Sequence, residues 1–271
     1  MDTTKPVALV TGASSGIGKA AALALVPAGF EVVGTSRNAS RVAPHRGVTF
    51  LDLDVTSDES VSTLVRIVIE RFGRIDVLVN NAGTGAAGAA EESSVAQDQR
   101  VFDINFFGLI RMTKAVLPHM RAQGRGRIIN ISSVLGLVPA PYMASYAATK
   151  HAIEGYSESV DHELREHGVR VLLVEPAYTK TGFDANALQA DAPLPVYAAQ
   201  RQAFDRVIAS AMQGGDDPVI VAKSIVAAAT DPKPKLRYTA GSAAGRVSAL
   251  RRFVPAWAFD RQIRKLNHLP A

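Results

Sequence analysis

The stretch VALVTGASSGIG at residues 7–18 joins a short apolar run to a glycine-rich turn, and a helical pattern follows it. Its three glycines allow a tight turn and let backbone N–H groups approach a pyrophosphate, while the helix N-terminus adds partial positive charge. The spacing G-x-x-x-G-x-G differs from the general dinucleotide fingerprint G-x-G-x-x-G. A plain strand-to-helix connection is the alternative interpretation. The turn predicts cofactor contacts from six residues: Gly12, Ser14, Ser15, Gly16, Ile17 and Gly18.

Short apolar or β-branched runs alternate with longer helical segments along the rest of the chain. The runs predict seven strands, at 7–10, 31–35, 48–51, 76–79, 127–131, 169–174 and 236–239. Helical spacing covers 16–27, 58–72, 97–122, 144–167 and 218–230. Strands separated by helices require right-handed crossovers. The predicted fold class is therefore α/β, a doubly wound seven-stranded parallel sheet of the Rossmann type with helices on both faces.

Length and composition limit the kinds of protein this can be. The chain has 271 residues, of which 47% are hydrophobic and 20% charged, as expected for a globular protein with a large core. Cysteine is absent, which excludes disulfides and thiolate metal sites, and we predict no metal site. No apolar stretch reaches the roughly 20 residues of a membrane-spanning helix, and the start lacks a secretory pattern. We therefore expect a cytoplasmic protein.

Charge is unevenly distributed between the body of the chain and its end. Residues 232–271 carry nine basic residues and one acid, whereas residues 1–231 have a net charge of −3. A basic tail can be a solvated face, or it can bind nucleic acid or an anionic membrane. The body has no basic stripe with interleaved aromatics, which argues against nucleic acid, and Pro255 interrupts any long membrane-surface helix. We divide the chain into a domain at 1–240, with a lid at about 178–215, and a basic extension at 241–271.

The second predicted strand ends in Gly34-Thr35-Ser36-Arg37-Asn38, about 20 residues past the glycine turn. A site that prefers NAD presents an acid there to the ribose 2′-hydroxyl. The guanidinium of Arg37 would instead form two hydrogen bonds to a 2′-phosphate. Arg37 therefore favours NADP(H) over NAD(H), and the alternative is that it is only a surface residue at the end of a strand.

Tyr146 and Lys150 lie four positions apart near the start of the predicted helix at 144–167. That spacing places the phenol and the ammonium on one face of the helix. Asn130-Ile131-Ser132-Ser133 ends a predicted strand, where α/β sheets have their ligand crevice. Taken singly, each of these residues is more often structural, as a core aromatic, a solvated lysine or a strand-end cap.

Several motifs together resemble the short-chain dehydrogenase/reductase family, from residue 7 to about 240: TGASSGIG at 11–18, NNAG at 80–83, the Asn of NFFG at 105, NISS at 130–133 and YAATK at 146–150. The resemblance implies a catalytic tetrad of Asn105, Ser133, Tyr146 and Lys150. Ser133 is preferred over Ser132 because it precedes the tyrosine by thirteen positions. Further cofactor contacts are implied for Asp54, Val55, Asn81, Ala82, Gly83, Tyr146, Lys150, Pro176, Thr179 and Thr181.

One motif departs from the family pattern. Where Pro-Gly is usual, this chain has Pro176-Ala177, and alanine adopts a positive φ only with strain. The placement of Thr179 and Thr181 on the nicotinamide carboxamide rests on this motif.

The resemblance implies hydride transfer between NADP(H) and a carbonyl or secondary alcohol. Tyr146 would be the general acid/base, Ser133 would polarise the substrate oxygen, and Asn105 would position a water that relays protons through Lys150. A free phenol has a pKa of about 10, so a cation beside it would favour the phenolate.

Apolar residues between and after the Ser and Tyr motifs favour an apolar substrate, with ordinary packing as the alternative: Leu135, Leu137, Val138, Tyr142, Met143, Tyr178 and Phe183. The competing function is a non-catalytic NADP(H)-binding sensor or scaffold. By resemblance, we expect a homo-oligomer, a dimer or tetramer, formed through the helices at 97–122 and 144–167. We expect no nucleic-acid partner.

Overall fold

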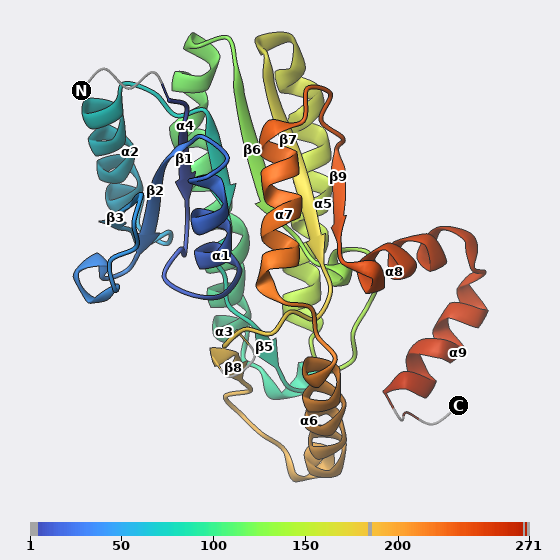
Figure 1. Cartoon of the computed structure of the whole chain (residues 1–271). Coiled ribbons are helices and arrows are strands. Elements are labelled where there is room, and N and C mark those ends of the chain that lie inside the picture. The colour runs from blue at the N-terminus through green and yellow to red at the C-terminus, as the bar shows by residue number, and fades with distance from the viewer. Residues whose placement is uncertain (1–4, 184–185, 268, 270–271) are drawn as a thin grey trace.

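The computed structural model describes residues 5–183, 186–267 and 269, and within them a parallel seven-stranded sheet forms the centre (Figure 1). The strands follow the order β3-β2-β1-β4-β6-β7-β9, and every neighbouring pair is parallel. The strand order reverses between β1 and β4, which is where doubly wound sheets bind ligands. The predicted fold class is confirmed. The strands are β1 Val7–Val10, β2 Glu31–Ser36, β3 Val48–Asp52, β4 Val77–Asn80, β6 Gly126–Ile131, β7 Val169–Pro176 and β9 Arg237–Ala240.

Helices cover both faces of the sheet because the central strands bury side chains on both sides. On one face, α1 (Gly16–Leu25) and α7 (Pro218–Thr230) lie side by side in front of the strands in Figure 1 and share one hydrophobic cluster with them. On the other face, the cluster includes side chains of three helices: α2 Asp58–Phe72, α4 Gly108–Ala122 and α5 Ala144–Leu164.

The helix boundaries follow local chemistry. Ser57 caps α2 by accepting a hydrogen bond from the Ser60 N–H at 3.2 Å, and Gly73 ends it at a φ of 74°. The first helix ends at Leu25, short of the predicted residue 27. The predicted helix at 97–122 is interrupted: α3 (Val95–Phe102) and α4 are joined by a π-helical turn, η3 (Asp103–Phe107).

The lid segment, 178–215, contains a helix that the sequence pattern does not predict. Helix α6 (Ala198–Gln213) has sixteen residues. Phe204 is the only buried side chain among them, so the helix carries no apolar stripe. Before α6, the short strand β8 (Leu188–Gln189) pairs with β5 (Ala86–Ala87), a two-residue strand in the loop after β4. The buried Glu92 carboxylate accepts a hydrogen bond from the Leu194 N–H at 2.7 Å and pairs with Arg201. These contacts fasten the segment predicted to be a lid to the loop that follows β4.

The basic extension forms two helices after β9. They are α8 (Ser242–Phe253) and α9 (Ala256–Leu266), and the break between them falls at Val254-Pro255. Within the described part of the chain, no helix is long and apolar enough to cross a bilayer. Short 3₁₀ turns complete the structure: η1 Ala39–Arg41, η2 Ala90–Glu92, η4 Val134–Gly136, η5 Arg165–His167 and η7 Pro195–Tyr197.

Candidate active site

The glycine turn lies between β1 and α1 and leaves no room for side chains. Gly12 and Gly16 have φ angles of 64° and 53°, which favour glycine. A Cβ on Gly18 would lie 2.3 Å from the Gly12 carbonyl oxygen and 2.4 Å from the Asn81 amide nitrogen. No side chain caps the N-terminus of α1, and its first turn has no acid. The exposed N–H groups and the small cradle therefore fit a pyrophosphate.

The NNAG motif fastens the glycine turn to β4. The Asn81 side-chain amide donates to the carbonyl oxygens of Thr11 and Gly12 at 2.9 and 3.1 Å. The Thr11 hydroxyl oxygen accepts hydrogen bonds from the N–H groups of Asn81 and Ala82 at 2.9 and 3.0 Å. Next to it, a Cβ on Gly83 would lie 3.1 Å from Asn105 Oδ1. The side chain of Asn81 thus supports the turn.

Arg37 lies just past the end of β2 and is exposed. It makes no ion pair with any residue in the described ranges, so its guanidinium is available to an anion. Asp54 accepts hydrogen bonds from the N–H and hydroxyl of Thr56 at 2.9 and 2.7 Å. These bonds, with a smaller contribution from the charge of Arg37, lower the pKa of Asp54. Val55 is buried against Gly108.

Tyr146 and Lys150 face one another on α5, as the i, i+4 spacing predicts. Both are buried, and Lys150 Nζ lies 5.5 Å from the centroid of the Tyr146 ring. The ammonium donates a hydrogen bond to the Ile131 carbonyl oxygen at 2.8 Å, at the end of β6. Burial lowers the pKa of Lys150 to about 8, opposed by the charge of Glu154. A buried cation that titrates near neutrality is suited to proton exchange with a phenol.

Ser133 and Asn105 enter the site from two other elements. Ser133 follows β6, and its hydroxyl oxygen accepts a hydrogen bond from the Leu135 N–H at 3.1 Å. Asn105 lies in η3, a kind of turn that is frequent at functional sites. Its amide oxygen accepts from the Thr84 N–H at 2.8 Å, and its amide nitrogen donates to Thr84 O at 2.9 Å and Thr149 Oγ1 at 3.3 Å. Thr149 directly precedes Lys150, so the bond to Thr149 connects η3 to α5.

A buried polar ladder, which has no predicted role, holds α5 against the strand ends. Asn80 Nδ2 donates to Asn130 Oδ1 at 2.9 Å, and Asn130 Nδ2 donates to Ser157 Oγ at 2.8 Å. The asparagine that ends β4 and the one in β6 are the sequence signal for this ladder, since both occur in the quoted motifs.

Pro176 ends β7, and Ala177 follows without strain. Within the described ranges, Tyr142 is the only non-glycine residue with a positive φ, so the alanine occupies an ordinary conformation. Thr179 is buried, and its hydroxyl donates to the Ala177 carbonyl oxygen at 3.0 Å. Thr181 lies against the glycine turn, since a Cβ on Gly16 would come within 3.2 Å of its methyl group.

Apolar side chains of the lid and of the segment before α5 surround Tyr146. Its ring packs on Phe183 with centroids 5.7 Å apart, and Tyr142 packs on Phe204 at the same separation. Tyr142 holds a φ of 62°, a strained conformation of the kind found at functional sites. The cluster around Tyr146 also includes Met143, Ala86, Ala87, Leu135, Ala140 and Ile208.

The sequence profile described as short chain dehydrogenase matches residues 6–192. The chain belongs to this family. A 3-ketodihydrosphingosine reductase of Bacteroides thetaiotaomicron is 45% identical over 180 residues, which are 66% of each chain. A short-chain dehydrogenase of Streptomyces avermitilis superposes with a TM-score of 0.82 at 34% identity, over 99% of this chain and 97% of that one. This short-chain dehydrogenase is thus an oxidoreductase that acts on CH–OH or C=O groups.

Solved relatives of this short-chain dehydrogenase hold either nicotinamide nucleotide. ElxO with NADP bound is 28% identical over 88% of this chain and 97% of that one, with a TM-score of 0.73. A Burkholderia phymatum relative in complex with NAD has the same identity over 97% and 96% of the chains, with a TM-score of 0.80. The family therefore binds NAD or NADP, and the glycine turn described above fits either.

Behind Lys150, the short-chain dehydrogenase contains an acidic cluster that no motif predicts, in which Glu154 and Glu175 are buried and Glu158 is half-buried. The Arg237 guanidinium lies 3.0 Å from Glu175, 2.9 Å from Glu154 and 2.6 Å from Glu158. Burial, and then the charge of Glu154, raises the pKa of Glu175 to about 7, and burial likewise raises the pKa of Glu154. Arg237 is the cation that these carboxylates share, and burial disfavours the ionised forms of Glu175 and Glu154.

Glu175→Gln is expected to make the stability of the short-chain dehydrogenase less dependent on pH. A raised folded-state pKa means that the stabilising contribution of this carboxyl is complete below pH 4.5 and is lost as the pH rises through about 7. The wild type should lose unfolding free energy between about pH 5 and pH 8, and the variant should lose less. Urea unfolding across this range measures the difference. Exposed Glu166→Gln is the control, and identical pH profiles for wild type and Glu175→Gln would contradict the prediction.

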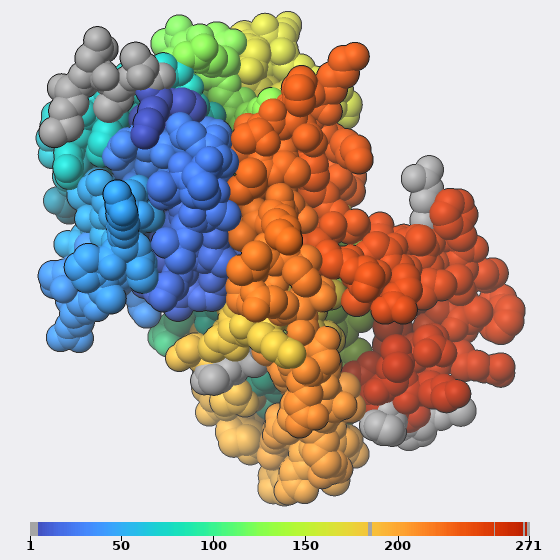
Figure 2. Space-filling view, in the orientation of Figure 1, coloured from blue at the N-terminus to red at the C-terminus, as the bar shows by residue number. Residues whose placement is uncertain are grey.

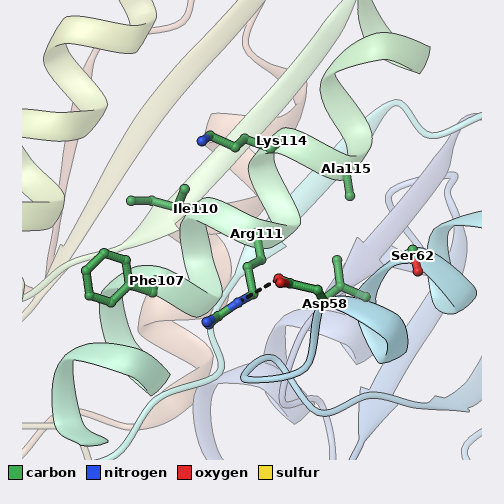
Figure 3. Close-up of a pocket in the computed structure, with 8 residues that line it drawn as sticks. Asp58, Ser62, Phe107, Ile110, Arg111, Lys114 and Ala115 are labelled. Atoms are coloured by element: carbon green, nitrogen blue, oxygen red, sulfur yellow. Dashed lines mark hydrogen bonds and ion pairs between the residues drawn. The ribbon is translucent and has the colours of Figure 1, made fainter. Parts of the chain in front are cut away.

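A groove on the outer surface of the short-chain dehydrogenase lies away from this chemistry (Figure 3). Across the groove, the guanidinium of Arg111 on α4 forms an ion pair with Asp58 on α2 at 2.9 Å. Phe107, which also lines the groove, is exposed. No residue of the predicted catalytic tetrad lines it. Self-association through the helices predicted at 97–122 and 144–167 stays a prediction. The groove is lined by Asp58, Val61, Ser62, Phe107, Ile110, Arg111, Lys114 and Ala115.

Proposed function

We propose that this chain is an NADP(H)-dependent reductase or dehydrogenase for apolar carbonyl compounds or secondary alcohols, with Tyr146 as general acid/base. The observation that carries the proposal is the buried Lys150 ammonium, 5.5 Å from the centroid of the Tyr146 ring. It lies at the carboxyl ends of the central strands, where the glycine turn also lies. A cation so close to the phenol favours its ionised form and equips it to exchange a proton.

The other residues of the tetrad have separable roles. NADPH, when bound by the glycine turn, supplies a hydride. Ser133 already accepts a backbone hydrogen bond, which leaves its O–H free to donate to the substrate oxygen. Tyr146 gives its proton to that oxygen in reduction and takes it back in oxidation. Asn105 and Thr149 fix η3 against α5 and so keep the proton path through Lys150 in place.

Arg37 supports NADP(H) over NAD(H), because it is an exposed guanidinium, with no ion-pair partner in the described part of the chain, at the position of a ribose-binding acid. Arg37→Asp is expected to lower kcat/KM for NADPH by about 10- to 100-fold, since a charge-assisted hydrogen bond is lost and a repulsive charge is gained. Its kcat/KM for NADH should stay equal or rise. Steady-state kinetics with both nucleotides measure the ratio.

Arg41→Asp is the matched control, since Arg41 is also exposed and lies in η1, four positions after Arg37. It makes the same change in net charge and should alter the NADPH to NADH ratio by less than about threefold. An equal change in both variants would mean that general charge, not Arg37, sets the preference.

The apolar cluster around Tyr146 supports the substrate class. The test follows NADPH consumption with aldehydes and ketones of increasing chain length beside polar keto acids. Turnover should rise with apolar chain length, in keeping with the Bacteroides relative named for reducing a ketone. A clear preference for keto acids would overturn the apolar class, and tight NADPH binding without any turnover would favour a sensor.

A further inference from the structure

Helices α8 and α9 form a C-terminal arm, residues 242–266, that stands out from the body of the molecule (Figures 1 and 2). Large apolar side chains on this arm face solvent. Phe253 is 78% exposed and Trp257 69%, and Leu250 and Leu266 are more than half exposed. Exposed apolar side chains that gather on one segment, unlike those scattered singly over a surface, mark contact sites.

The charges of the arm are almost all of one sign. It carries six basic residues against one acid, Asp260. Exposed basic residues flank the two exposed aromatics in the sequence: Arg246 and Arg251 precede Phe253, and Arg261 and Lys265 follow Trp257. Two short helices with exposed aromatic and basic side chains, of which α9 is amphipathic, have the composition of segments that lie in the interface of an anionic bilayer.

The base of the arm is fixed beside the active site. Ala244 of α8 is fully buried, and Arg251 Nε donates to the Leu137 carbonyl oxygen at 3.2 Å. Leu137 belongs to the segment between Ser133 and Tyr146. Arg251 also lies over the Phe259 ring, 5.4 Å from its centroid, which ties α9 back to α8. A surface that holds the arm would therefore lie near the opening of the site.

We propose that the C-terminal arm docks the protein on an anionic membrane surface, with Phe253 and Trp257 in the headgroup layer. Pro255 does not oppose this role, because α9, which is the amphipathic helix of the two, begins after it. A symmetric arm-to-arm contact with a second copy is disfavoured, since it would place two strongly basic surfaces together. The inference goes beyond the proposed function, and it would let apolar substrate reach the site from the lipid.

The test uses the full chain and its only tryptophan, Trp257. Vesicles of phosphatidylcholine with about one third phosphatidylglycerol should bind it at least about tenfold more tightly than pure phosphatidylcholine, and should shift its fluorescence to the blue. High salt should reverse the binding. Co-sedimentation of the double variant Phe253→Ser plus Trp257→Ser should fall at least about tenfold, whereas Val95→Ser, which is 72% exposed on α3, should bind like wild type.

Three results would overturn the proposal: equal binding to neutral and anionic vesicles, no fluorescence shift, or unchanged binding by the double variant. A blue shift that appears without vesicles as the protein concentration rises, together with a doubled mass in light scattering, would mean that the arm binds a second copy instead. Turnover of a water-soluble carbonyl is measured in parallel. If the wild type turns over the carbonyl but does not bind vesicles, only the proposed membrane role of the arm is wrong. If the wild type shows no turnover, the proposed function is wrong.

Discussion

Tyr146→Phe is expected to lower kcat by about a thousandfold while leaving the NADPH dissociation constant within about threefold of wild type. The substitution removes one hydroxyl and keeps the ring, so the packing on Phe183, 5.7 Å between centroids, is preserved. Without the phenol hydroxyl, no proton donor is held between the Lys150 ammonium and the substrate oxygen. Single-turnover NADPH oxidation at saturating carbonyl separates this chemical step from binding.

Tyr156→Phe is the matched control for that variant. Tyr156 lies on the same helix and packs edge-on against Phe106, 5.9 Å between ring centroids, away from the glycine turn. Loss of its hydroxyl should leave kcat within about twofold. If Tyr146→Phe retained more than about a tenth of wild-type turnover, another group would have to supply the proton and the proposed chemistry would be wrong.

Gly18→Ala is expected to lower both folding stability and NADPH affinity. The new methyl carbon would lie 2.3 Å from the Gly12 carbonyl oxygen and 2.4 Å from the Asn81 amide, closer than atoms in a packed protein approach. The backbone of the glycine turn must shift to admit it. We expect a loss of about 2 kcal/mol in unfolding free energy and at least a tenfold weaker NADPH affinity. Urea unfolding and fluorescence titration measure these two effects.

Gly155→Ala tests whether any alanine in a helix has this effect. Gly155 lies within α5, and a Cβ there meets no atom within 4 Å. Alanine stabilises an exposed helix interior by about 0.5–1 kcal/mol relative to glycine, so this variant should be slightly more stable. Equal destabilisation by both variants would contradict the steric reason given for Gly18.

The sheet could be predicted from the sequence because each strand is a compact apolar run between helices, and the predicted limits agree with the structure to within one or two residues. Two features could not. Helix α6 buries only Phe204, so its spacing carries no apolar stripe. The turn η3 looks like continuous helix, because widening one turn leaves no mark in composition.

The candidate site was predictable where its residues are close in sequence. Tyr146 and Lys150 share a helix face by spacing alone. The acidic cluster was not, because Arg237 meets Glu154 across 83 positions and nothing local indicates that pairing. The ion pair between Glu92 and Arg201 could not be predicted for the same reason, since the two residues are 109 positions apart. Contacts of this kind become visible only when the sheet brings the elements together.

The turn η3 also sets the rotational phase between the helices on either side of it. Val101 and Leu109 are both buried, yet they lie eight positions apart, which in an uninterrupted α-helix is a rotation of about 80° between them. An extra residue accommodated in a widened turn reduces the effective separation to seven and the rotation to about 20°. The two apolar stripes then fall into line. The folding of the chain should therefore tolerate substitutions in Asp103–Phe107, apart from the site residue Asn105, more readily than a deletion there, because losing one residue would turn all of α3 away from the core.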